Sequence, residues 1–208
     1  MNRNFDCYAI TNSAKLFYSV AICCAPANSI DKYLDVDLFY ALCNTGCVNY
    51  NKKWSCPPHS PSYKDFSAGW EHLFILCARM ELSQFSYVKT DYLKVKAANS
   101  ILKSRVDKFL RYIKTKYGRY ISTGSCRLCK PCKCKIGLPC AHSELMAYSF
   151  EAMGVDVSKL VIEQFQKPLL WYKPQCLPEY TSVVCGLLTN AEITLQDLQE
   201  EYLQHVKY

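Results

Sequence analysis

The strongest chemical signal in the sequence is a run of closely spaced cysteines in its second half. Cys126, Cys129 and Cys132 form a C-x2-C-x2-C run, and Cys140 follows eight residues later. Two residues between successive thiols allow the backbone to curl, so that the sulfurs converge on one centre. Short runs of this kind hold iron–sulfur clusters in bacterial ferredoxins, whereas structural zinc usually takes two separated C-x2-C pairs. The run therefore predicts a 4Fe-4S cluster, with zinc and with structural or redox-active thiols as the alternatives.

A fifth thiol, that of Cys134, makes the choice of the fourth ligand a real question. We favour Cys140, because Gly137 and Pro139 can shape a turn that returns the chain to the site. The block carries four basic side chains and no acidic one, and these would offset the negative charge of a thiolate-bound centre. The basic residues are Arg127, Lys130, Lys133 and Lys135.

A second group of cysteines lies earlier in the chain. Cys43, Cys47 and Cys56 are followed by two prolines and then by His59. Three thiols can hold a metal or a cluster and leave one position open, which chemistry on a substrate requires. His59 would close such a site as a fourth ligand. The alternative is a Pro-rich loop in which buried cysteines pack around Trp54, since free cysteine is among the most buried residue types.

Composition limits the class of protein. The chain has 208 residues, of which 50% are apolar and 21% are charged, so disordered and collagen-like classes are excluded. No stretch approaches the roughly 20 apolar residues of a membrane span, and the N-terminal segment makes a poor signal peptide because Asp6 lies in its cationic region. A chain of this size does not need disulfides to fold. Its 14 cysteines therefore indicate a reduced, cytoplasmic protein.

The net charge of +7 is concentrated in residues 91–119, which contain nine Lys or Arg and two Asp. One interpretation is the solvated face of a helix. The other is a surface that attracts an anionic small molecule or an acidic redox partner protein. Nucleic acid is not expected as a partner, because the polar face of this segment offers few aromatic side chains and no nucleic-acid-binding fold is apparent.

The surrounding elements predict a single domain, 1–208, of the α/β or α+β class, with a mixed sheet flanked by helices. The clearest helix, at 92–117, has an apolar period near 3.6. The two cysteine loops, 43–59 and 124–142, lie between elements, while Cys77 and Cys185 fall in core strands and are expected to be packing residues. Strands are expected within 8–25, 72–82, 120–124 and 180–188, and helices at 31–42, 92–117, 143–153, 157–166 and 191–206.

These blocks together resemble an uncharacterised prokaryotic family of predicted metal-binding proteins, a domain of unknown function. The resemblance covers roughly 38–188 and implies metal binding through the cysteines, without a known reaction. The chain departs from the family at His142 and its neighbours, where a basic residue and a proline are usual, and in having Cys134. Glu151 and Asp156 lie in a matching segment, where we favour a structural role over acid–base chemistry. The matching motifs are Cys43, Cys47, Trp54-Ser55-Cys56-Pro57-Pro58, Gly124-Ser125-Cys126-Arg127-Leu128-Cys129-Lys130-Pro131-Cys132, Pro139-Cys140, 149–157 and 180–188.

Three functional hypotheses follow from the residues. The first is an iron–sulfur protein with a redox or electron-transfer role, which uses both cysteine blocks. The second is a non-catalytic zinc module whose basic helix binds an anionic partner or nucleic acid, and whose affinity would fall steeply with salt. The third is a protein that handles sulfur or metal through reactive thiols of low pKa. The sequence does not assign an enzymatic reaction.

Overall fold

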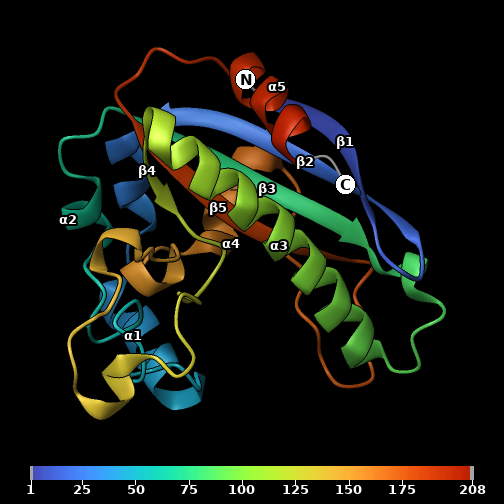
Figure 1. Cartoon of the computed structure of the whole chain (residues 1–208), viewed down its shortest axis with the longest axis horizontal. Helices are drawn as coiled ribbons and strands as arrows, with labels where there is room; N and C mark the ends of the chain where they lie inside the picture. Colours follow the sequence, from blue (N-terminus) through green and yellow to red (C-terminus); the bar gives the residue numbers. More distant parts are fainter. Residues whose placement is uncertain (1, 207–208) are drawn as a thin grey trace.

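The structure is a computed structural model that describes residues 2–206, and its centre is one five-stranded sheet (Figure 1). The strand order is β1-β2-β3-β5-β4, and every described pairing is antiparallel. The strands are β1 (Asn2–Ile10), β2 (Lys15–Pro26), β3 (His72–Glu81), β4 (Gly118–Ile121) and β5 (Tyr180–Thr189). The helices are α1 (Val36–Gly46), α2 (Tyr63–Ser67), α3 (Asp91–Tyr117), α4 (Val157–Phe165) and α5 (Leu195–His205).

Both faces of the sheet are covered, which explains the composition of its central strand. Figure 1 shows α3 and α5 across one face and α4 behind the other. Alternate residues of β3 therefore enter two hydrophobic clusters: Leu76 packs beneath α3 and α5, while Ile75 packs toward α4 and α2. Because neither face of β3 meets solvent, eight consecutive residues of this strand are buried.

The long helix α3 connects the sheet to the second cysteine block. Thr90 caps its first turn, with the Thr90 Oγ1 atom accepting from the Leu93 amide at 3.4 Å. One face of α3 is buried against the sheet, at the spacing that the apolar pattern predicts, and Gly118 follows its last residue. Strand β4 begins there and leads directly into the segment that carries Cys126. The buried residues of α3 are Ala98, Leu102, Val106, Phe109, Leu110 and Ile113.

The expected α+β class is confirmed, but the expectation of a mixed sheet is wrong. β1 and β2 form a hairpin, closed where the Thr11 amide donates to the Ala14 carbonyl at 3.0 Å. The later strands enter the sheet after long excursions and pair antiparallel as well. A right-handed βαβ crossover between parallel neighbours, which a mixed sheet would require, does not occur among residues 2–206.

Two predicted helices are also corrected. The segment 31–42 splits into a 3-10 turn at Ala27–Tyr33 and helix α1, so that Cys43 lies within the helix and not after it. The segment 143–153 contains only two short 3-10 turns, because the chain between them is extended and the Tyr148 carbonyl accepts from the Ser122 amide at 2.8 Å. No helix within residues 2–206 has the length and apolar character needed to span a membrane.

Candidate metal centre

The first cysteine block begins on α1 and ends in a turn-rich segment. Asp35 caps α1 by accepting from the Leu38 amide at 3.1 Å, and Cys43 lies in the last turns of that helix. Burial raises the pKa of the Cys56 thiol to about 11, and its other neighbours include the thiols of Cys47 and Cys43, which raise this pKa as well. The three thiols of this block are therefore close enough to act on one another.

In the second block, a left-handed turn brings the chain back toward its beginning. A 3-10 turn at Lys133–Ile136 ends at Gly137, whose φ of 69° suits glycine. Partial burial raises the pKa of the Cys129 thiol, and the thiols of Cys132, Cys126 and Cys140 raise it further. Three thiols of this loop thus lie near that of Cys129, and the Cys140 favoured from the sequence is one of them.

Cys134 stands apart from these four thiols. Its side chain is buried, with 8% exposed, and burial raises the pKa of its thiol, with Cys132 as the one neighbouring thiol that contributes. Cys134 therefore behaves as a small packing residue at the base of the 3-10 turn. The ligand role of Cys140 remains a prediction.

Three consecutive residues of the first block bind the second block directly. The Lys53 ammonium donates to the Ser125 hydroxyl at 3.0 Å and to the Cys126 carbonyl at 2.8 Å. The Trp54 indole donates to the Leu138 carbonyl at 2.9 Å. Figure 1 accordingly shows the two loops side by side below the sheet.

Ser55 lies next to one cysteine of each block. Its side chain is fully buried, and its hydroxyl oxygen accepts from the Cys126 amide at 3.0 Å. The same hydroxyl lies 3.9 Å from the Cys56 sulfur and stabilises the thiolate form, because hydrogen bonding from Ser55 lowers the pKa that burial raises. One hydroxyl therefore touches a candidate ligand of each block. Neither Lys53 nor Ser55 was predicted to have this role, although Ser55 directly precedes Cys56 and Lys53 lies three residues before it.

The donor set suits a metal that prefers sulfur, since thiolates are the ligands of iron–sulfur clusters and of structural zinc. The side chains are not drawn into a ready-made coordination sphere: no group of three or more His, Cys, Asp or Glu residues within 2–206 has the arrangement that holds a metal ion. His59, the suggested fourth ligand of the first block, is occupied elsewhere. Its ring nitrogen pairs with Asn51 Oδ1 at 2.8 Å, and its ring packs edge-on against Trp54.

The second block opens on a solvent-filled cleft of about 450 Å³. Cys140 lines this cleft together with Trp54, His59 and Tyr148. Burial raises the pKa of Tyr148, Arg119 lowers it, and the thiols of Cys140 and Cys126 raise it again. Tyr148 therefore lies near two candidate ligands. The segment that carries it was predicted to be helical.

The remaining predicted residues have structural roles. Cys77 and Cys185 are fully buried on β3 and β5, which confirms them as core residues. Asp156 caps α4 by accepting from the Lys159 amide at 3.0 Å, so the structural role favoured for it is confirmed. Glu151 opens a 3-10 turn and acts electrostatically on both Cys43 and Lys103.

Comparison with known families matches residues 33–188 to the family described as predicted metal-binding protein (DUF2284). The chain belongs to this family. The matched span contains both cysteine blocks and agrees with the region of resemblance in the sequence. The family description supports metal binding and specifies neither a metal nor a reaction. Searches of the curated proteins and of the solved structures gave no match.

Proposed function

We propose that this DUF2284 protein is an iron–sulfur protein with a redox or electron-transfer role. The observation that carries the proposal is that the thiols of Cys126, Cys132 and Cys140 all act on the thiol of Cys129, whereas only the thiol of Cys132 acts on that of Cys134. Cys126, Cys129, Cys132 and Cys140 would hold a 4Fe-4S cluster. A bound cluster of this type supplies one-electron transfer.

The surroundings of the four thiols support an anionic centre. Burial and the neighbouring thiols raise the pKa of Cys129, whereas the Lys133 ammonium lowers it. The ammonium of Lys53 is fixed beside Cys126 by two hydrogen bonds. Because metal binding requires thiolates, these cations favour the charged form of the ligands and would compensate the charge of the bound centre.

The first block would hold a second centre through Cys43, Cys47 and Cys56. With His59 paired to Asn51, this block offers three thiolates and one position for an external ligand. The contact of Ser55 with both blocks would transmit a change at one centre to the other. An exposed position of this kind suits a labile cluster that reacts or exchanges electrons with a partner.

Zinc is the second candidate, because four thiolates in one loop also satisfy a tetrahedral ion. It would make the chain a non-catalytic module whose basic helix α3 binds an anionic partner or nucleic acid. Two lysines of α3 already form intramolecular ion pairs, Lys116 with Glu201 at 2.8 Å and Lys94 with Asp91 at 2.9 Å. That pairing reduces the charge available to a polyanion and favours the redox proposal.

All 14 cysteines are free thiols, which supports a reducing, cytoplasmic location and a redox partner protein or an anionic small molecule as the partner. The test is the amount of iron, zinc and acid-labile sulfide per chain after anaerobic purification, with the visible spectrum. Iron and sulfide in equal amounts with a coloured protein are expected. Zinc in a colourless protein would overturn the iron–sulfur proposal, and metal-free protein would overturn both candidates.

Variants assign the ligands. Cys126→Ala and Cys56→Ala should each remove the metal of one block, and retention of all metal in both would refute the ligand assignment. The matched pair Cys140→Ala and Cys134→Ala distinguishes the two candidates for the fourth ligand of the second block. We expect loss of metal in the first and retention in the second, and the reverse result would transfer the ligand role to Cys134.

A further inference from the structure

A second cleft, away from the thiols, lies between α3 and β5. It has a volume of about 460 Å³, which is within the range of small-molecule sites. The N-terminal half of α3 forms one wall, and the segment between α4 and β5 forms the other. At one end the wall is completed by Thr123 and by Arg127, of which Arg127 belongs to the second cysteine block.

Cationic side chains lie at the end of the cleft next to that block. Lys103 and Arg127 line this end, Lys96 lines the cleft nearer to Tyr92, and Glu151 is the single acidic residue of the lining. None of these three cations forms a salt bridge within residues 2–206. The Lys103 ammonium reaches the cysteine loop itself, because it lies 3.5 Å from the position that a Cβ atom on Gly124 would take.

The proximity of two of these cations has an electrostatic cost. Burial lowers the pKa of Lys103, and the nearby Arg127 guanidinium lowers it further, while Glu151 and Asp107 raise it. Two like charges that line one cleft and act on one another, neither of them in a salt bridge within residues 2–206, are relieved by an anion bound beside them.

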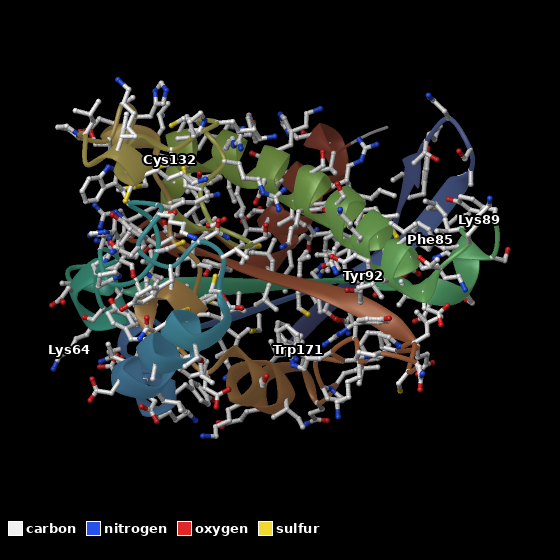
Figure 2. The ribbon with its side chains drawn as sticks, turned by 90° about the horizontal axis from the view of Figure 1, so that it is seen from below. Lys64, Phe85, Lys89, Tyr92, Cys132 and Trp171 are labelled. Carbon is white, nitrogen blue, oxygen red and sulfur yellow. The ribbon has the colours of Figure 1, made fainter. Side chains whose placement is uncertain are left out.

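The other end of the cleft is aromatic. Tyr92 and Trp171 line it and are 56% and 64% exposed. The Tyr92 ring packs at a tilt against Tyr172, with 5.8 Å between the ring centroids, and a large part of its surface stays accessible to a ligand. Figure 2 shows Tyr92 at the N-terminal end of α3 with Trp171 on the facing segment, whereas Cys132 lies toward the opposite end of the molecule. Eleven residues separate Tyr92 from Lys103, which is a rise of about 16 Å along the helix. Asn99 and Ser100 lie between the two ends of the cleft.

We propose that this cleft binds a nucleoside phosphate. The base stacks on Trp171 and Tyr92, the sugar passes the polar side chains of Asn99 and Ser100, and the phosphates lie against Lys103 and Arg127. A planar ring and an anion separated by a sugar-sized spacer match the two ends of the cleft better than a simple anion does. Binding does not depend on which metal the cysteines hold; a role for the nucleotide as substrate or regulator of that centre rests on the proposed function.

The test is isothermal titration calorimetry of the purified full chain with ADP, adenosine and inorganic pyrophosphate. ADP should bind with a Kd below about 1 mM, and at least about tenfold more tightly than either fragment, because each fragment fills one end of the cleft. If adenosine bound as tightly as ADP, the cations would contribute nothing to binding. If pyrophosphate bound as tightly as ADP, the aromatic end would contribute nothing. Either result, or no binding of ADP, would overturn the proposal.

Variants locate the site. Lys103→Met and Arg127→Met should each weaken ADP by about tenfold or more, which is the usual effect of losing a charged hydrogen-bond partner. Lys108→Met, a lysine on the same helix outside the cleft, is the matched control and should leave the affinity unchanged. Equal effects of Lys103→Met and Lys108→Met would refute this location. Metal content is measured on the same samples, so that loss of the metal centre is distinguished from loss of the nucleotide.

Discussion

Replacing Ser55 by alanine tests whether the two cysteine blocks act as one unit. The substitution removes one oxygen atom, which accepts from the Cys126 amide at 3.0 Å and lies 3.9 Å from the Cys56 sulfur. The volume change is small, so the lost hydrogen bonds dominate the effect. An amide left without a partner in a partly buried position costs about 1–2 kcal/mol. For a chain of this size, that loss lowers the Tm by about 2–8 °C.

The same variant should weaken metal retention. Groups that orient a metal ligand through a hydrogen bond typically contribute about 10- to 100-fold to metal affinity. Without the Ser55 hydroxyl, the Cys56 thiolate loses the hydrogen bond that partly counteracts burial, and its pKa rises further. We expect at least a tenfold shift in the chelator concentration that removes half of the metal.

The matched control is Ser104→Ala, which removes the same atom from an exposed position on α3. Thermal unfolding and chelator competition are measured on both variants under anaerobic conditions. The reasoning fails if Ser55→Ala and Ser104→Ala have the same Tm and release metal at the same chelator concentration. Lys53→Met, which removes two further hydrogen bonds to the second block, provides an independent variant in case Ser55→Ala does not fold.

Three further outcomes are expected. Gly154→Ala should destabilise the fold by about 1–3 kcal/mol in denaturant unfolding, because this residue has a φ of 84° and an added Cβ would lie 2.6 Å from a valine methyl of α1. Gly46→Ala, in α1 with open space around it, should be neutral or stabilising, and equal effects would contradict this account. With the metal removed, iodoacetamide at neutral pH should alkylate the exposed Cys176 well before Cys56, because burial raises the pKa of the Cys56 thiol to about 11. Mass spectrometry measures the two rates. Equal rates would contradict the burial of the Cys56 thiol. Glu201→Gln should lower the free energy of unfolding by up to about 1 kcal/mol above pH 4.5, because a lysine of α3 lowers the pKa of this carboxyl from 4.5. The difference from the wild type should vanish as the pH falls through the folded pKa. A difference that persists in acid would show that the ion pair is not its source.

The elements that the sequence predicted well are those whose burial pattern is set within the element. The apolar run of β3 and the 3.6 period of α3 report directly on the faces that these elements bury. The segment 143–153 failed for the opposite reason. Ala147, Phe150 and Met153 are buried at a helical spacing, but the Tyr148 carbonyl pairs with Ser122, so a tertiary contact overrides the local pattern.

In the candidate site as well, the local features could be predicted from the sequence and the long-range contacts could not. The spacing of Cys126, Cys129 and Cys132 is local, and the turn at Gly137 that favours Cys140 is written in the sequence. The link through Ser55 is not, since 71 residues separate it from Cys126. Between them the chain passes through α2, β3, α3 and β4, and only the packing of those elements brings the two loops together.

The contact between the two cysteine blocks also fixes a positive charge, that of Lys53, beside the second block. The two hydrogen bonds of Lys53 tie a cation of the first block to the backbone and side chain of the second. Four thiolates around a divalent ion, or around a cluster of charge +2, carry a net charge of about −2. Because partly buried charges are screened less than exposed ones, a fixed ammonium at this point lowers the free energy of the bound state more than the exposed lysines of the loop do. The first block therefore contributes to the second even without a metal of its own, and any change that loosens residues 53–55 is expected to weaken both.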